Sequence, residues 1–333
     1  MTVVSWNSSP RLTIVMYHYV RRVAASRFPR LAALELDAFR GQLDFIRRHY
    51  KPISIFDVVS AASHSVEVPA GAMVLTFDDG YAEHYREVFP LLRQAGIPAT
   101  FFPAASALIE RRLLDVNKIQ FILAAVETPD ILVTSIDEAV EATRGRTDVR
   151  PLSDYRAEGW KAVRFDSPAA SYVKYMLQGA LPDDVRTRIL DELFAKFVSG
   201  DQRAFAEELY MTVEEAREIR EAGMTIGAHA DRHLTLTSLS RDDQAHEIDG
   251  ALRVLDAAGA TRSGFAFSYA KGAYNDDSLA LLRERACAIA VTNRRGNAIV
   301  GPDDDNMLTL PRFDAKHLPT DPDASPTDWT SRV

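Results

Sequence analysis

The sequence contains a single cysteine, Cys287, so the chain cannot form an internal disulfide. Cys287 lies in the run ACAIAV, which is typical of a buried strand, and such surroundings favour an inert core thiol over a nucleophile. Long hydrophobic runs are also missing, because no window approaches the roughly 18 consecutive apolar residues of a membrane-spanning helix. Residues 1–19 lack the basic start and long apolar stretch of a signal peptide. We therefore expect a cytoplasmic protein without a membrane span.

Positive charge is scarce. The 39 lysines and arginines are outnumbered by 47 aspartates and glutamates, which gives a net charge of −8. Proteins that bind nucleic acids usually present a basic face, so we expect no nucleic-acid partner. The contents of 47% hydrophobic and 26% charged residues are those of an ordinary globular protein. They indicate nothing about an oligomeric state.

Short apolar runs alternate with helical patterns along most of the chain. This alternation predicts an α/β fold with a largely parallel sheet or a barrel. Helix-start signals support it, since Thr212 opens a capping box and Ser240 precedes a helix with one buried stripe. The predicted strands are residues 12–17, 53–56, 73–77, 98–102, 224–228, 264–267 and 288–292.

Residues 108–210 break this alternation, because they show helical patterns and no convincing strand. We predict a single barrel domain over residues 10–317, interrupted by a mainly helical insertion at 108–210. An irregular tail, rich in proline and aspartate, follows at 318–333. The insertion either packs as a cap or forms a lid or substrate wall, and the sequence leaves both possibilities open.

Two adjacent acids stand where one predicted strand ends, in the segment TFDDGY at residues 76–81. Side chains alternate between the faces of a strand, so Asp78 and Asp79 can point the same way only if the chain is leaving the sheet. Gly80 permits such a turn. Taken alone, the pattern is equally typical of an Asp-Gly turn without a function.

Two histidines follow another predicted strand, in the segment HADRH at residues 229–233. His229 and His233 can meet on one face if this segment coils into a helical turn. Together with one carboxylate, Asp79 or Asp78, they would supply three ligands to a metal ion and leave a position for water. An isolated pair of this kind is more often two structural histidines, and its context decides.

In an α/β barrel, functional side chains lie at the carboxyl ends of the strands. Residues that are distant in the sequence can therefore share one rim. The residues at such ends are His18, Asp78, Asp79, His229, His233, Ser268 and Tyr269.

Three segments are similar, in order and spacing, to the first three motifs of the polysaccharide deacetylase family, also called the NodB-homology or carbohydrate esterase family 4 group. The resemblance covers residues 10–107 and 208–317 and leaves out the inserted segment. It implies a distorted (β/α) barrel and metal-dependent removal of an N-acyl group, usually acetyl, from an amino sugar. The segments are residues 76–81, 229–233 and 265–272 (FAFSYAKG), and MYHYV at 16–20 and GIPATFF at 96–102 also resemble many members.

The resemblance also implies roles for individual residues. Asp79, His229 and His233 would bind one divalent metal ion, and Asp78 would be the base that activates the attacking water. Zinc is the first expectation for the metal, and cobalt, nickel, manganese or iron also suit such a ligand set. By the same resemblance, the backbone N–H of Tyr81 would help to hold the oxyanion. Further residues expected to face the substrate are Ser268 and Tyr269.

The sequence departs from the family pattern at several places. Ala230 stands where members commonly have serine or threonine. The third motif lacks the arginine that orients the base in many members, and Lys271 or Arg312 is a candidate to replace it. The fourth motif, an acid followed by tryptophan, has only Asp328-Trp329 as a candidate, close to the end of the chain.

The general acid that protonates the leaving amine has two candidates. His317 is the late one, by resemblance to a late Leu-x-His motif, and His18 is the early one at a predicted strand end. The other histidines are expected to be ordinary surface or helix-face residues, namely His49, His64, His84 and His246.

The predicted function is therefore that of a metal-dependent N-deacetylase with an N-acylated amino sugar or saccharide as substrate. The missing export signal suggests an intermediate of surface polysaccharide assembly. Two alternatives remain. One is a hydrolase of another C–N bond, in a cyclic amide or formamide. The other is a carbohydrate-binding protein that has lost catalysis, which the altered third motif and the missing fourth motif would explain.

Overall fold

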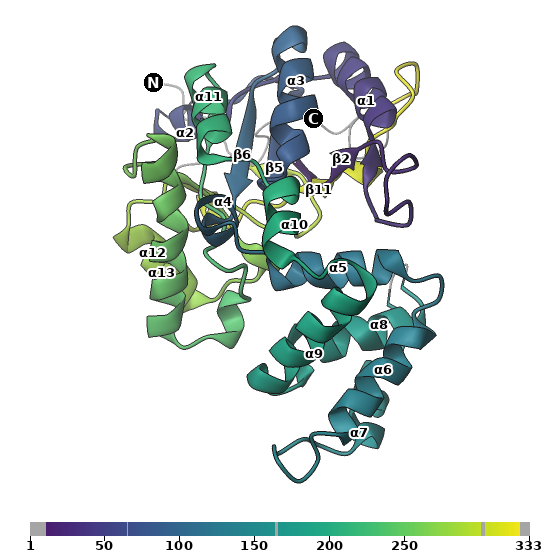
Figure 1. The fold of residues 1–333 in the computed structure, drawn as a ribbon. Coiled ribbons are helices and arrows are strands. Elements are labelled where there is room, and N and C mark those ends of the chain that lie inside the picture. The colour runs from purple at the N-terminus through teal and green to yellow at the C-terminus, as the bar shows by residue number, and fades with distance from the viewer. Residues whose placement is uncertain (1–10, 65, 164–165, 301–303, 327–333) are drawn as a thin grey trace. The chain divides into compact units, whose positions relative to one another are not determined.

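The computed structural model describes residues 11–64, 66–163, 166–300 and 304–326 (Figure 1). Contacts divide the chain into two compact units. Unit 1 takes the described residues of Met1–Arg22, Ala33–Arg112 and Glu207–Val333, and unit 2 takes those of Val23–Ala32 and Leu113–Ala206. Unit 2 therefore includes a short amino-terminal segment as well as a long internal one.

The main sheet of unit 1 has the order β10-β1-β5-β6-β7, with β11 also paired to β1 and β4 paired to β5. All of these pairings are parallel except that of β10 with β1. Smaller sheets pair β2 with β3 and β8 with β9. The strands are β1 (Arg11–Tyr17), β2 (Val20–Arg21), β3 (Leu34–Glu35), β4 (Lys51–Pro52), β5 (Ala72–Asp79), β6 (Ala99–Pro103), β7 (Thr225–Ile226), β8 (Ala266–Ser268), β9 (Ile289–Val291), β10 (Ala298–Ile299) and β11 (Phe313–Asp314).

The mixed α/β class is confirmed, but the named strands do not form a closed sheet among the described residues. Two isolated bridges add single pairings: Ala228 pairs with Phe267 of β8, and Val291 of β9 pairs with Leu310. One predicted strand was wrong. Residues 53–56 lie mostly in a helix start, because Ser54 caps α2 (Ile55–Ser63) with a capping box to Asp57.

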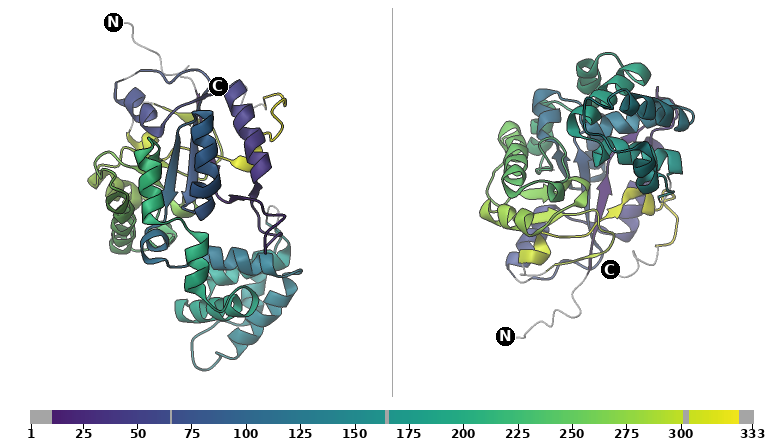
Figure 2. Two further views of the ribbon diagram at one scale, coloured as in Figure 1. Left: turned by 45° about the horizontal axis from the view of Figure 1, so that its top comes forward. Right: turned by 90° about the horizontal axis from the view of Figure 1, so that it is seen from below.

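The two faces of the central strands bury different side chains, as the period of two along a strand requires. Val15, Leu75 and Phe77 face a cluster that includes side chains of α1, α3, α11 and α12, whereas Ile14 and Val74 face α2, β8 and β9. Figure 2 shows helices around the strands of this unit. The helices of unit 1 are α1 (Leu36–His49), α2, α3 (Phe89–Ala95), α4 (Ala105–Glu110), α11 (Val213–Glu221), α12 (Arg241–Ala258), α13 (Asp276–Glu284) and α14 (Asp304–Met307).

Unit 2 is built from helices around its own aromatic core, in which Phe121 and Phe194 pack against Phe205. Its helices are α5 (Asp115–Ala125), α6 (Asp130–Glu141), α7 (Leu152–Gly159), α8 (Pro168–Tyr175) and α9 (Asp183–Phe197), and α10 (Gln202–Leu209) crosses the boundary between the units.

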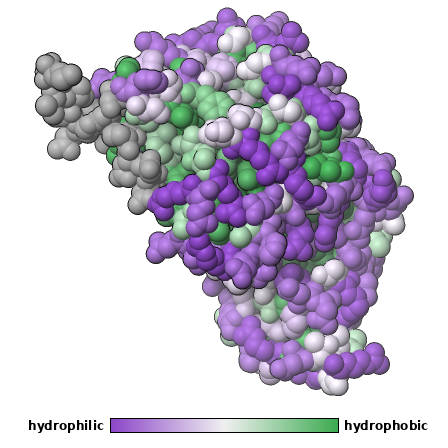
Figure 3. Space-filling view, turned by 90° about the vertical axis from the view of Figure 1, so that its left-hand side faces the viewer, coloured by the Kyte–Doolittle hydropathy of each residue, from purple (hydrophilic) through white to green (hydrophobic). Residues whose placement is uncertain are grey.

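Hydrophilic side chains cover most of the face drawn in Figure 3, and hydrophobic ones gather in a smaller area of it. None of the helices formed by the described residues has the length and apolar content that crossing a bilayer requires. The described part of the carboxyl tail, residues 318–326, has no regular secondary structure.

Candidate metal centre

Strand β5 carries both acids of the first motif at its carboxyl end. Asp78 and Asp79 are almost fully buried, at 2% and 3% exposure. Asp79 adopts a left-handed backbone conformation with φ of 71°, followed by Gly80 at 73°. For a residue with a side chain this conformation costs about 1–2 kcal/mol. The chain thus begins to turn at Asp79, one residue earlier than the sequence suggested. The charges of both carboxylates act on His229.

The two histidines lie in an irregular loop after β7, so the helical turn through which their spacing would let them meet is not formed. They meet instead because His233 is left-handed, with φ of 63°. His229 donates from Nδ1 to the backbone carbonyl of Ser268 at 2.7 Å. Since a carbonyl oxygen only accepts, this bond places a proton on Nδ1, so in the neutral imidazole the lone pair lies on Nε2.

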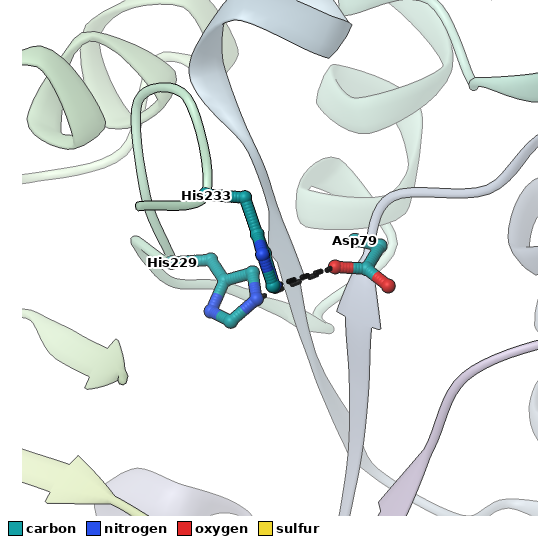
Figure 4. A group of neighbouring side chains, drawn as sticks. All are labelled: Asp79, His229 and His233. Atoms are coloured by element: carbon teal, nitrogen blue, oxygen red, sulfur yellow. Dashed lines mark ion pairs between the residues drawn. The ribbon is translucent and has the colours of Figure 1, made fainter. Parts of the chain in front are cut away.

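Asp79, His229 and His233 converge (Figure 4). Asp79 Oδ1 lies 3.3 Å from His229 Nε2 and 3.6 Å from His233 Nε2. Two atoms that each bind one tetrahedral zinc ion at about 2.1 Å are about 3.4 Å apart, so these spacings suit a shared ion. Within the described residues, Asp79 Oδ1 and His229 Nε2 are buried without a hydrogen-bond partner. The donor set therefore fits a divalent metal ion.

The electrostatics of the group also favour a cation. Burial would raise the pKa of Asp79, but its contact with His229 and the charge of His233 hold that pKa well below its ordinary value. Burial lowers the pKa of His233 to about 4, and the neighbouring His229 adds to that effect. His233 is consequently neutral at pH 7 and has a lone pair for a metal. Burial lowers the pKa of His229 too, but Asp79 and Asp78 raise it above the ordinary value, as expected where two carboxylates attract positive charge.

Arg312 replaces the arginine that is missing from the third motif. Arg312 is 2% exposed, and its guanidinium binds both oxygens of Asp78, with Nη1 at 2.9 Å from Oδ1 and Nη2 at 2.7 Å from Oδ2. Thr76 Oγ1 accepts a further bond from Nη1 at 2.9 Å. Burial raises the pKa of Asp78, but the charge and hydrogen bonds of Arg312, together with the charges of His229 and His18, outweigh burial and keep that pKa below its ordinary value. Asp78 is therefore held ionised and in one orientation.

Lys271, the other candidate for this role, is left-handed with φ of 55°. Its backbone carbonyl accepts a hydrogen bond from Asn293 at 2.7 Å, and its charge acts on His233. The bidentate contact to Asp78 belongs to Arg312.

The three residues predicted to face the substrate have different surroundings. Tyr81 donates its hydroxyl to Asp79 Oδ2 at 2.6 Å, so one oxygen of this carboxylate is occupied and Oδ1 faces the histidines. Ser268 donates to Asp78 Oδ2 at 3.2 Å and accepts from Arg312 at 3.0 Å. Tyr269 is not brought to the group, because its hydroxyl donates to the Leu308 carbonyl and its ring packs in a hydrophobic cluster.

His18 follows β1, whose neighbour β5 ends in the two aspartates, and its charge acts on both of them. The backbone carbonyl of His18 accepts a hydrogen bond from His84 Nε2 at 2.7 Å. His84 lies in the helical turn His84–Val88, one of the two settings expected for it, but it is completely buried and not on the surface. Burial lowers the pKa of His84 to about 4, so it is a neutral donor that fixes the chain at His18.

His317 lies in the turn Ala315–His317, which follows β11 at the same edge of the sheet as His18. Burial lowers its pKa, and the charges that act on it are those of Arg295, Asp314 and Lys316. The candidate for the fourth motif, Asp328-Trp329, lies outside the described residues.

Comparison with known proteins identifies the family. The sequence profile described as polysaccharide deacetylase matches residues 65–133 and 194–288. The poly-beta-1,6-N-acetyl-D-glucosamine N-deacetylase of Escherichia coli (strain K12) is 36% identical over 93 residues, which cover 28% of this chain and only 14% of that protein. The resemblance seen in the motifs is thus confirmed, and the chain carries a polysaccharide deacetylase domain.

Solved structures share the fold. The deacetylase PplD of Streptococcus pyogenes, in complex with acetate, has a TM-score of 0.54 and 17% identity, with 92% of each chain covered. IcaB from Ammonifex degensii has a TM-score of 0.52 and 16% identity, again with 92% of each chain covered. A de-N-acetylase from Aggregatibacter actinomycetemcomitans has a TM-score of 0.53 and 13% identity, covering 97% of this chain and 100% of its own.

Proposed function

We propose that this chain is a metal-dependent N-deacetylase that hydrolyses the acetamide of an N-acetylated amino sugar in a saccharide. One observation carries the proposal: Asp79 and the two histidines converge at metal-binding spacing beside Asp78, which a buried arginine keeps ionised. The family implies hydrolysis of amide bonds. Because the curated relative is named for poly-beta-1,6-N-acetyl-D-glucosamine, β-1,6-linked N-acetylglucosamine oligomers are the first substrates to test.

We also propose that unit 1 is a distorted barrel that contains the whole site. Three observations support a ring of strands. Strands β1, β5, β6 and β7 are paired in one sheet, isolated bridges join Ala228 to β8 and Val291 of β9 to Leu310, and β11 pairs with β1. The ring would surround the cluster that contains Ile14 and Val74. The predicted insertion at 108–210 would then interrupt the barrel in the sequence and fold as a separate helical unit. Its role as a cap, lid or substrate wall stays open.

In the proposed reaction Asp79, His229 and His233 hold the divalent ion, for which zinc is the first expectation. When bound, such an ion lowers the pKa of a water ligand and polarises the substrate carbonyl. Asp78 then removes a proton from the attacking water, and its low pKa ensures that it is unprotonated at neutral pH. Arg312 and Ser268 keep its oxygens in place throughout.

The remaining steps need an oxyanion donor and an acid. The backbone N–H of Tyr81 is proposed as the donor, because it follows the turn at Asp79 and Gly80. For the acid that protonates the leaving amine, the position of His18 beside both aspartates favours His18 over His317. The place of the substrate in surface polysaccharide assembly stays a prediction.

The test is acetate release by the purified full chain after loading with Zn²⁺ or Co²⁺. Substrates are β-1,6- and β-1,4-linked N-acetylglucosamine oligomers, together with cyclic amides and formamides for the alternative hydrolase. Asp78→Asn should lower kcat/KM on the preferred sugar by about 10²–10⁴-fold and retain the metal. Asp183→Asn, which alters an exposed acid of unit 2, should behave like the parent.

Metal and saccharide binding without turnover would favour the non-catalytic alternative. Turnover of cyclic amides or formamides alone would favour the other hydrolase. Equal acetate release by the parent and Asp78→Asn would refute the assigned base.

A further inference from the structure

The ring of His233 packs against that of His229, but it lacks the hydrogen bond that orients its neighbour. His229 is anchored through Nδ1 to the Ser268 carbonyl, but His233 Nδ1 is buried without a hydrogen-bond partner among the described residues. His233 also has the less favourable backbone, with φ of 63°. The contacts that hold the backbone of its loop therefore help to fix its position.

The first half of that loop is held by α4. Ala105 N–H donates to the Ala230 carbonyl at 2.9 Å, and both the N–H and the hydroxyl of Ser106 donate to the Asp231 carbonyl, at 3.1 and 2.6 Å. These bonds end at Asp231, two residues before His233. The second half needs a separate support.

Glu247 of α12 supplies it. This side chain is 4% exposed, and its Oε1 accepts the N–H of Arg232 at 2.9 Å and the N–H of Leu234 at 3.2 Å. The two N–H groups flank the left-handed His233 on either side. Successive N–H groups around such a residue form a concave site for an anion, and here a carboxylate of the same chain fills it. The contact therefore stabilises the very conformation that turns His233 toward Asp79.

Two more residues on the same face of α12 hold the loop close to the helix. Gly250 and Arg253 follow Glu247 at intervals of three residues, which share one helix face. A Cβ at Gly250 would lie 2.7 Å from Asp231 Cβ, closer than real Cβ contacts allow. Arg253 Nη2 binds Asp231 Oδ1 at 2.5 Å. Only a helix without a side chain at position 250 can therefore approach the loop to this distance.

We propose that this face of α12, formed by Glu247, Gly250 and Arg253, positions His233 for the metal ion. The three are positioning residues, since they act on the ion only through the loop. The inference rests on the proposed metal site. It adds that the affinity of the site for its ion is set in part by a helix whose residues do not touch the ion.

The test measures the affinity of the purified full chain for Zn²⁺ and Co²⁺ by competition with a chelator. The absorption spectrum of the Co²⁺ form and the melting temperature of the metal-free protein are measured on the same variants. Substitutions of residues that orient a metal ligand typically lower the affinity for the metal by about 10–100-fold. Glu247→Gln removes the charge and keeps the shape, so a decrease at the lower end of this range is expected. Gly250→Ala displaces the loop, so a larger decrease and an altered Co²⁺ spectrum are expected.

Gly250→Ala separates positioning from general stability, because alanine is the better helix residue and opposes any loss of melting temperature. Asp256→Asn is the matched control, since Asp256 lies on the same helix but pairs with Arg262. It should retain the parent's affinity and spectrum.

Parent affinity in both Glu247→Gln and Gly250→Ala would overturn the inference. So would a lower melting temperature in Glu247→Gln with unchanged affinity, because that result describes a purely structural contact. If the parent binds neither ion, the proposed metal site fails, and this inference fails with it. Failure of the inference alone is recognised by tight binding in the parent and in both variants.

Discussion

The charged groups of the two units differ in what surrounds them. In unit 2, Arg144 pairs with Glu141 on the surface, and the two side chains are 44% and 47% exposed. In unit 1, Arg312 and Asp78 form an equally short pair at 1% and 2% exposure, next to buried Asp79 and His229. Exposed pairs contribute little to stability, whereas buried charges require complete compensation.

The charged pair of unit 2 is thus exposed to water, whereas that of unit 1 is enclosed by the fold. The polar group at the end of β5 keeps atoms of Asp79 and His229 buried and without hydrogen-bond partners among the described residues. A fold tolerates buried polar atoms without hydrogen-bond partners where a bound ligand supplies the missing partner. Several titratable groups with perturbed pKa values in one place are also a recognised sign of a functional site.

The largest effect is expected from removing the central carboxylate. Asp79→Ala should reduce affinity for Zn²⁺ by far more than the 10–100-fold typical of substitutions behind a metal ligand, because a ligand itself is lost. Titration with metal and a chelator measures it. Asp137→Ala in unit 2 is the control, since Asp137 also pairs with an arginine, Arg156, but should change melting temperature only. Similar losses of metal affinity in both variants would contradict the contrast between the units.

Breaking the buried pair should come next. Arg312→Leu leaves Asp78 buried without its partner, which costs about 3–5 kcal/mol in the free energy of unfolding. Denaturant unfolding measures this loss. Arg312→Lys retains the charge but cannot bind both oxygens, so an intermediate loss is expected.

Arg312→Leu should also change how the free energy of unfolding depends on pH. In the parent, the pKa of Asp78 is lower in the folded state than in the unfolded state, so its ionisation stabilises the fold above the unfolded-state pKa of about 3.9. This stabilisation is lost as pH falls through the folded-state pKa. Without Arg312, burial raises the folded pKa instead, so the variant should gain stability relative to the parent as pH falls. The acid limb of its activity should move to higher pH. Parallel pH profiles would show that Arg312 does not control Asp78.

A smaller effect is expected at Tyr81. Tyr81→Phe removes the hydroxyl from Asp79 Oδ2 and frees this oxygen to turn toward the ion. Affinity for the metal should fall by about 10–100-fold, as for other groups that orient a ligand. Tyr17→Phe removes another buried hydroxyl, one that has no hydrogen-bond partner among the described residues, and should leave affinity unchanged.

The smallest effect belongs to the surface of unit 2. Arg144→Gln removes the exposed pair with Glu141 at the end of α6. Water solvates both groups when they separate, so the melting temperature and the metal affinity should remain those of the parent. A clear loss of metal affinity here would show that unit 2 influences the site, and would remove the distinction drawn between the two units.

Local signals in the sequence predicted local structure well. Thr212 forms the expected capping box, and Ser240 caps α12. The strand predicted at residues 53–56 failed because a short apolar run fits a helix start as well as a strand. Such ambiguity is resolved by what packs against the segment, which a single sequence does not contain.

By itself, the sequence determined the α/β class, the polysaccharide deacetylase resemblance and the acids and histidines of the motifs, because each depends on residue type and short spacing. Three features became visible only in the folded chain: Arg312 binds Asp78, the histidines meet through a left-handed turn, and Glu247 holds this turn. Arg312 and Glu247 are remote in sequence from the side chains and N–H groups they bind, and no local pattern encodes such contacts. They arise when the strands and α12 pack together, because buried charges and N–H groups must then find partners wherever the fold brings them.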